Sequence, residues 1–262
     1  MKIAVSGKGG VGKTTVAATL SRLLARDNFK VLAVDVDSNP NLGIALGLSP
    51  EKANDIVPIC ENHELIHERV GGEGGVYKLN PKADDIASKF GVSTKDNVNL
   101  LVVGTVRVAG TGCMCPAGAL IKALLRKLIL EKDEIVVLDL EAGLEHLGRG
   151  IVKNVDILLV VLEPNVKSII TAKRITELAK PLGVKKIAGI VNKILDGEEK
   201  EKIQSFEKEI GIPILVTLNY DPLVFEADSK GIPLLDYSPS SKVVKAIKEL
   251  KNELVSYSRL SR

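Results

Sequence analysis

The chain has 262 residues, of which 45% are hydrophobic and 26% charged, the composition of an ordinary globular protein that can bury a sizeable core. A net charge of +3 and an aromatic content of 3% argue against a nucleic-acid partner, and no apolar run is long enough to span a membrane. Three cysteines and a first segment without the apolar stretch of a secretory signal predict a cytoplasmic protein without a disulfide framework.

Short runs of valine, isoleucine and leucine alternate along the chain with helical patterns. The runs are almost continuous, as in parallel strands covered by helices on both faces. They lie at residues 2–6, 31–35, 100–103, 135–139, 157–162, 187–192 and 214–217. The helical patterns lie at residues 14–26, 117–130, 166–182 and 200–210. This alternation predicts an α/β fold with a doubly wound, mostly parallel sheet of about seven strands.

Residues 51–97 do not follow this alternation. They combine mixed charge with four glycines between residues 71 and 75. We expect them to form an irregular insertion of short helices and loops, within a single domain that spans residues 1–262.

The first predicted strand leads into the sequence GKGGVGKTT at residues 7–15, and a helix follows. This order fits the phosphate-binding loop G-x-x-x-x-G-K-[ST] of P-loop NTPases, in which backbone N–H groups and a helix N-terminus surround the phosphates. Lys13 would pair with the β- and γ-phosphates, and the Thr14 hydroxyl would bind Mg²⁺. The residues expected around the nucleotide phosphates are Gly9, Gly10, Val11, Gly12, Lys13, Thr14 and Thr15.

The same residues also satisfy the dinucleotide-binding pattern G-x-G-x-x-G, with Asp35 at the end of the next strand. Three features favour a nucleoside triphosphate instead. Lys13 and Thr14 supply a cation and a hydroxyl that a dinucleotide fold does not need. Asp139 ends a second strand and is followed by Gly143, which suits Mg²⁺ and a γ-phosphate. Asn192 and Lys193 end a third strand, where they suit a purine base.

Residues 8–15 resemble the deviant Walker A loop of the MinD/ParA/nitrogenase-iron-protein superfamily, whose mark is an additional lysine, here Lys8. The resemblance implies a homodimeric ATPase in which Lys8 reaches the nucleotide of the partner subunit. A cation supplied in this way neutralises charge on the transferring phosphoryl group.

The resemblance extends to other segments that end predicted strands. Residues 34–37 resemble the first switch, in which Asp37 would orient or deprotonate the attacking water. Residues 139–143 resemble the second switch, in which Asp139 would hold Mg²⁺ through water. Asn192 matches the residue that contacts adenine. Residues 218–222 resemble a loop that faces the base, with Asn219 in place of the usual proline, followed by Tyr220 and Asp221.

Cys113 and Cys115 are separated by one residue and precede Pro116, which opens a predicted helix. In extended backbone their side chains point the same way, with Cα atoms ~6.6 Å apart, so both sulfurs can bind one metal ion. A second subunit could supply two more thiolates. Four sulfurs suit Zn²⁺, Ni²⁺ or a shared iron–sulfur cluster. The alternative is that both cysteines are small buried hydrophobic residues. Cys60 is isolated and is expected to be a plain thiol.

The cysteine pair and residues 141–150 resemble the maturation ATPases of nickel carbon monoxide dehydrogenase, the CooC type. That resemblance implies that ATP closes a homodimer, that Ni²⁺ binds the cysteines at its interface, and that hydrolysis releases the metal to the dehydrogenase apoenzyme. The accessory ATPase of acetyl-CoA synthase shares these features. A ParA/MinD-type positioning ATPase and an iron–sulfur electron-transfer ATPase remain as alternatives.

Two further patterns have simpler interpretations. Residues 63–67 read H-E-x-x-H, as in zinc proteases, but no third ligand follows at the required spacing, so we expect a solvated surface helix. Residues 241–260 form an apolar stripe flanked by lysines. Such a stripe can lie on a membrane, but it more often packs on the sheet, and we do not expect membrane contact.

Overall fold

The structure is a computed structural model that describes residues 1–71, 78–104, 116–131, 134–141, 154–195 and 199–260. In these parts of the chain, eight strands form one sheet with the order β3-β4-β2-β5-β1-β6-β7-β8. The strands are β1 (Lys2–Gly7), β2 (Val31–Asp35), β3 (Val92–Ser93), β4 (Asn99–Val102), β5 (Ile135–Asp139), β6 (Ile157–Leu162), β7 (Ile187–Ile194) and β8 (Ile214–Asn219).

The seven strands predicted from apolar runs are all present and pair in parallel. The estimate of about seven strands misses β3, which pairs antiparallel with β4 at the edge of the sheet. Strand β3 has only two residues, neither of them buried, so it leaves no apolar run in the sequence. The fold is otherwise the predicted doubly wound α/β arrangement.

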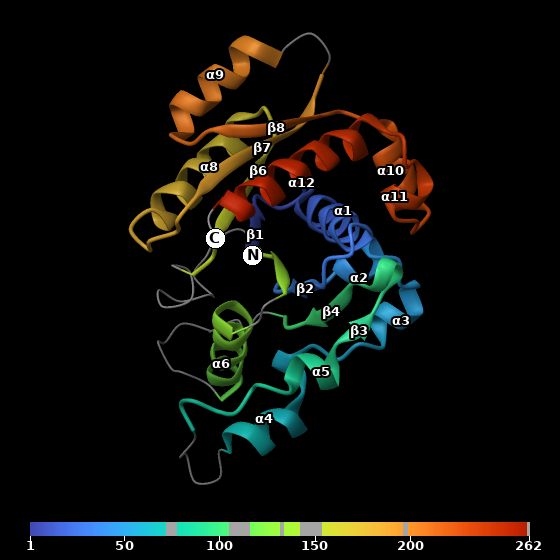
Figure 1. The fold of residues 1–262 in the computed structure, drawn as a ribbon, viewed down its shortest axis with the longest axis vertical. Helices are drawn as coiled ribbons and strands as arrows, with labels where there is room; N and C mark the ends of the chain where they lie inside the picture. Colours follow the sequence, from blue (N-terminus) through green and yellow to red (C-terminus); the bar gives the residue numbers. More distant parts are fainter. Residues whose placement is uncertain (72–77, 105–115, 132–133, 142–153, 196–198, 261–262) are drawn as a thin grey trace.

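Helices cover both faces of the sheet, and successive residues of a strand face opposite layers, as the pleat requires. In β1, Ile3 and Val5 pack with α1 (Lys13–Arg26) and α12 (Lys242–Leu260). Ala4 belongs to the opposite core, which contains α6 (Pro116–Glu131), α8 (Val166–Ala179) and α9 (Glu199–Ile210). Figure 1 shows α1 and α12 side by side, and α6 and α8 lie apart from this pair, in the opposite core.

The described part of residues 51–97 consists of short elements. Besides β3 these are the end of α3 (Pro50–Asn54), η1 (Ile59–Glu61), α4 (His63–Val70), α5 (Ile86–Phe90) and η3 (Lys95–Asn97). On α4, Leu65 and Ile66 are buried while His63 and His67 are exposed, so the H-E-x-x-H pattern lies on a surface helix. The single-domain organisation stays a prediction.

The C-terminal part contains α10 (Pro222–Ser229), α11 (Leu234–Tyr237) and α12. The apolar stripe of α12 is buried against α1 and β8, and this confirms that it packs on the sheet. Lys251, predicted to flank the stripe, is itself buried and pairs with Asp27. Within the described ranges, no helix is both long and apolar enough to cross a membrane.

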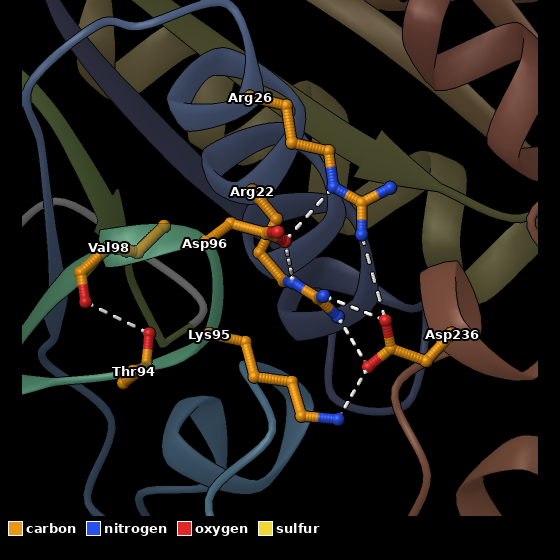
Figure 2. Close-up of polar contacts among 7 residues, drawn as sticks. All are labelled: Arg22, Arg26, Thr94, Lys95, Asp96, Val98 and Asp236. Carbon is orange, nitrogen blue, oxygen red and sulfur yellow. Dashed lines mark hydrogen bonds and ion pairs between the residues drawn. The ribbon is translucent and has the colours of Figure 1, made fainter.

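A buried arginine ties α1 to two distant segments of the chain (Figure 2). The Arg22 side chain is 2% exposed; its Nε donates to Asp96 at 2.7 Å, and its terminal nitrogens donate to both oxygens of Asp236 at 3.0 and 2.8 Å. Arg26 and Lys95 add ion pairs to the same two carboxylates. The helix that begins at the glycine-rich loop is therefore fixed to η3 and to α11.

Candidate functional site

The glycine-rich loop leaves β1 between β5 and β6 and enters α1, at the carboxyl edge of the sheet. Its tip is a tight turn in which the Val11 N–H donates to the Lys8 carbonyl at 3.4 Å. Gly10, the third residue of this turn, has φ +82°, the value that a type II turn requires and that glycine adopts without strain. The sequence Lys8-Gly9-Gly10-Val11 thus places Lys8 at the start of an exposed, sharply turned tip.

Two other glycines are required because neighbouring groups leave no room for a side chain. A Cβ atom at Gly7 would lie 2.2 Å from the carbonyl oxygen of Val161, and one at Gly12 would lie 2.5 Å from Nδ2 of Asn192. Gly12 has φ +95° and is the N-cap of α1, with no side-chain cap. The first N–H groups of α1 therefore face the loop without a side-chain acceptor, an arrangement that favours an anion.

Lys13 is buried at the first position of α1, with 7% of its surface exposed. Its ammonium group reaches back to the Lys8 carbonyl at 3.4 Å. A buried cation that spans the loop in this way is positioned to pair with phosphate oxygens that enter it.

Two acids lie next to the loop at the ends of adjacent strands. Asp35 and Asp139 are partners in the register of β2 and β5, with 0% and 2% exposure. Burial and the neighbouring charge of Asp35 raise the pKa of Asp139 to about 7, although a hydrogen bond with Thr14 and the charge of Lys13 oppose the shift. Oδ1 of Asp139 has no hydrogen-bond partner among the described residues. A buried carboxylate oxygen and a hydroxyl, side by side, are the ligands that Mg²⁺ prefers.

Asp37 begins the loop that follows β2, and its neighbours fix this loop. Asp35 accepts the N–H groups of Asp37 at 3.1 Å and of Leu42 at 3.0 Å, one with each carboxylate oxygen. Oδ1 of Asp37 accepts the Asn39 N–H at 3.0 Å. The Asp37 side chain is only partly buried and its charge acts on Asp139, so it lies near the loop with access to solvent.

A cavity of about 300 Å³ adjoins the loop and is bounded by the ends of β7 and β8. The predicted base-binding residues all line it: Asn192, Lys193, Asn219, Tyr220 and Asp221. The Tyr220 and Phe225 side chains at its rim are 56% and 73% exposed, which leaves aromatic surface on which a base can stack. The Asp221 carboxylate also caps α10 by accepting the Leu223 N–H at 3.0 Å.

Comparison with known proteins decides among nucleotide-binding families. Residues 2–234 match the model of the CobQ/CobB/MinD/ParA nucleotide binding domain. The chain belongs to this family. Family membership removes the dinucleotide alternative, and the protein is an ATPase of the MinD/ParA type.

Individual relatives of the family cover almost the whole chain. An uncharacterized ATP-binding protein of Methanocaldococcus jannaschii is 45% identical over 260 residues, 97% of this chain and 98% of the relative. The carbon monoxide dehydrogenase accessory protein CooC of Rhodospirillum rubrum is 39% identical over 245 residues, 92% of each chain. The structure of the septum site-determining protein MinD of Pyrococcus horikoshii, complexed with Mg-ADP, matches with a TM-score of 0.67 and 25% identity over 99% of this chain and 98% of the other.

Three residues of the site predicted for this MinD/ParA-type ATPase lie outside the described residues: Gly143, Cys113 and Cys115. The structure does place Pro116 at the start of α6, as the sequence predicts. In the described ranges, no group of three or more histidine, cysteine, aspartate or glutamate side chains could hold a metal ion, and His63 and His67 form no such group.

The sequence analysis gave no role to two residues that lie beside the phosphate loop. Asp35 belongs to the dinucleotide pattern and to the segment that resembles the first switch, but the sequence analysis gives it no role of its own; in the structure it organises the loop that carries Asp37. Glu163, at the end of β6, was not considered, yet it pairs with Lys193 at 2.5 Å. Its position after a buried strand was the available signal, since acids at the carboxyl edge of a parallel sheet lie near its ligand.

Proposed function

We propose that this chain is a homodimeric, Mg-ATP-dependent metallochaperone that binds Ni²⁺ through Cys113 and Cys115 and delivers it to a carbon monoxide dehydrogenase. The observation that carries the proposal is the 39% identity with CooC over 92% of both chains, taken with a cysteine pair in this sequence. Two thiolates leave a four-coordinate metal half complete, so a second subunit supplies the rest.

The nucleotide site supports the ATP-dependent part of the proposal. Lys13 and the N-terminus of α1 bind the β- and γ-phosphates. Thr14 and Asp139 hold Mg²⁺, which when bound neutralises phosphate charge; the Oδ1 atom of Asp139 and the Thr14 hydroxyl fit this role. Asp37 orients the attacking water from its anchored loop. Lys8 reaches the phosphates of the partner subunit from the exposed tip of its own loop.

An apolar pair on α8 supports the dimer. Val166 and Ile170 lie one turn apart at the beginning of this helix and are 72% and 60% exposed. Helix α8 starts shortly after Glu163, which contacts Lys193 at the nucleotide site. An exposed apolar pair next to the phosphate loop suits a partner subunit that must approach that loop.

Metal content of the dimer tests the nickel site. We expect one Ni²⁺ per dimer in the presence of a non-hydrolysable ATP analogue and less without nucleotide, measured by elemental analysis and sedimentation. Cys113→Ser with Cys115→Ser should abolish nickel binding. Cys60→Ser is the matched control, because burial raises the pKa of the Cys60 thiol and disfavours the thiolate that a metal needs. A double variant that still binds one nickel per dimer contradicts the proposal.

The same measurement separates the alternatives. Binding of Zn²⁺ instead of Ni²⁺ at the same stoichiometry would support the cysteine site but identify zinc as the metal that it carries. Iron and sulfide with visible colour would indicate an electron-transfer ATPase. Normal ATP-dependent dimerisation without any metal would favour a positioning ATPase, the function class that the likeness to MinD suggests. Reconstitution with dehydrogenase and acetyl-CoA synthase apoenzymes then distinguishes the two clients.

The dimer face has its own test. Val166→Asp combined with Ile170→Asp should prevent ATP-dependent dimerisation in sedimentation experiments. Leu178→Asp is the control, because Leu178 is a 39% exposed apolar residue at the other end of α8. If the double variant dimerises like the parent protein, α8 is not the dimer face.

A further inference from the structure

Lys193 lies at an irregularity of β7, where the pairing register with β8 shifts between Asn192 and Ile194. It lies near the end of β7 with φ +61°, in the left-handed region that residues other than glycine rarely adopt. Its N–H donates to the side-chain oxygen of the preceding Asn192 at 2.8 Å. Such a conformation at the edge of a site is retained when the neighbouring structure requires it.

The Lys193 side chain crosses to the tip of the phosphate loop. Its Nζ donates to the Gly10 carbonyl at 2.9 Å and to Oε1 of Glu163 at 2.5 Å. Glu163 is anchored in turn: its other oxygen accepts from the Asn165 side chain, and its N–H donates to the Ser168 hydroxyl, both at 2.9 Å. The ammonium group is therefore fixed between the loop and the start of α8.

These contacts orient two successive peptide groups of the loop. In a trans peptide the C=O and N–H bonds point in opposite directions, so a held carbonyl fixes the direction of the next N–H. Lys193 holds the Gly10 carbonyl, and the following Val11 N–H closes the turn on the Lys8 carbonyl. The Asn192 side chain holds the Val11 carbonyl at 2.8 Å, which directs the following Gly12 N–H.

We propose that Lys193, anchored by Glu163, is a positioning residue that fixes the turned tip of the phosphate loop and thereby the Lys8 side chain during ATP hydrolysis. Sequence analysis placed Lys193 among the base-binding residues, whereas here its cationic group acts through the loop. The inference rests on the proposed role of Lys8 and does not depend on nickel binding.

Lys193→Met tests this role, because it removes the ammonium group and keeps a side chain at the same strained backbone position. Loss of a charge-assisted hydrogen bond should lower kcat by about tenfold, with the Kd for ADP changed by less than about threefold. Lys193→Arg should restore most of kcat. Lys185→Met is the matched control, since Lys185 forms an exposed ion pair with Asp156 just before the start of β7, away from the loop.

Two further measurements separate a positioning role from a binding or structural one. The backbone amide signal of Val11 in the nucleotide-free protein should shift in Lys193→Met and return in Lys193→Arg. In a double-mutant cycle measured by kcat, Lys193→Met should cause no further loss of kcat in a protein that already carries Lys8→Ala. The inference is overturned if Lys193→Met leaves kcat unchanged, or if it lowers the affinity for ADP as much as it lowers kcat. It is also overturned if the two substitutions lower kcat additively in the cycle. All of these readouts are made without nickel, so they stand whether or not the metal proposal holds.

Discussion

Asp35 and Asp139 occupy matched positions on the adjacent strands β2 and β5, and both are almost completely buried. Burial raises the pKa of Asp35 to about 6, although the N–H groups of Leu42 and Asp37 lower it. Asp139 is shifted further, to about 7, by burial and by the charge of Asp35. At neutral pH and without a bound metal ion, ionisation of these two buried carboxyl groups therefore lowers the stability of the fold.

Replacing Asp139 should therefore stabilise the free protein in a pH-dependent way. The folded carboxyl keeps its proton up to about pH 7, whereas the unfolded one releases it above about pH 4, so stability falls as pH rises between these values. Asp139→Asn avoids this loss. We expect its free energy of unfolding to exceed that of the parent by about 2–4 kcal/mol at pH 8, and by much less at pH 5.

Urea unfolding at the two pH values, without Mg²⁺ or nucleotide, measures this difference. Asp55→Asn, which changes an exposed acid, is the control. The same Asp139 variant should lose Mg²⁺-dependent ATP hydrolysis. A stability gain that is equal at pH 5 and pH 8 would show that the charge of Asp139 is not its source.

Mixing two inactive variants tests whether Lys8 acts across the dimer. Lys8→Ala should lower kcat by about 10²–10³, at or below the roughly 10³–10⁵ that an arginine finger contributes to phosphoryl transfer. Asp37→Ala should be similarly inactive. In a mixed dimer, the site of the Lys8→Ala subunit has its own Asp37 and receives Lys8 from its partner, so activity should return. If Lys8 acts within its own subunit, every site in the mixture lacks one group and no activity appears.

Gly12 should tolerate alanine much less well than Gly9. Alanine at Gly12 combines a positive φ with a Cβ atom 2.5 Å from the Asn192 side chain, whereas nothing lies within 4 Å of a Cβ atom at Gly9. We expect Gly12→Ala to lose about 1–3 kcal/mol of stability and most nucleotide affinity. Gly9→Ala should unfold at nearly the temperature of the parent. Equal melting temperatures for the two variants would contradict this account of the loop.

The buried arginine network makes a further quantitative prediction. Arg22→Met removes the buried partner of the Asp96 and Asp236 carboxylates, which keep Arg26 and Lys95, and should cost about 1–3 kcal/mol at pH 7. Arg26→Met, at a 41% exposed position in the same network, should cost less than about 1 kcal/mol.

The pH dependence of the Arg22 variant has a definite sign. Burial would raise the pKa of Asp236, but hydrogen bonds from Arg22 and Lys95 keep it below its ordinary value. The stability from this pairing is present above about pH 4 and is lost as pH falls below it. The difference between parent and Arg22→Met in chemical unfolding should therefore shrink in acid. A constant difference would assign the cost to lost packing instead.

The parallel strands and the phosphate loop could be predicted because each depends on residues that are close together in the sequence. The run that became β6 is apolar throughout, the run that became β5 is apolar up to its final Asp139, and the loop motif occupies nine consecutive residues. The apolar stripe of α12 is also a local pattern, because it depends on the spacing of apolar residues within one helix. That stripe alone predicts that α12 packs on the sheet.

The missed features join residues that are far apart in the chain. Arg22 meets Asp96 and Asp236 at separations of 74 and 214 residues, and a charged residue in a helix is by itself most often solvent-exposed. Glu163 and Lys193 meet only because β6 and β7 are neighbours. The two residues of β3 carry no pattern at all.

The central position of β1 has a consequence for biosynthesis. Strand β1 is flanked by β5 and β6, and the loop that follows it is held by Asn192, which lies 181 residues after Val11. A nascent chain therefore makes its phosphate loop early and can organise that loop only after most of the polypeptide has left the ribosome. Incomplete translation products should not retain ATP, and nucleotide in the cell should assist only the last stage of folding, when nearly the whole sheet is in place.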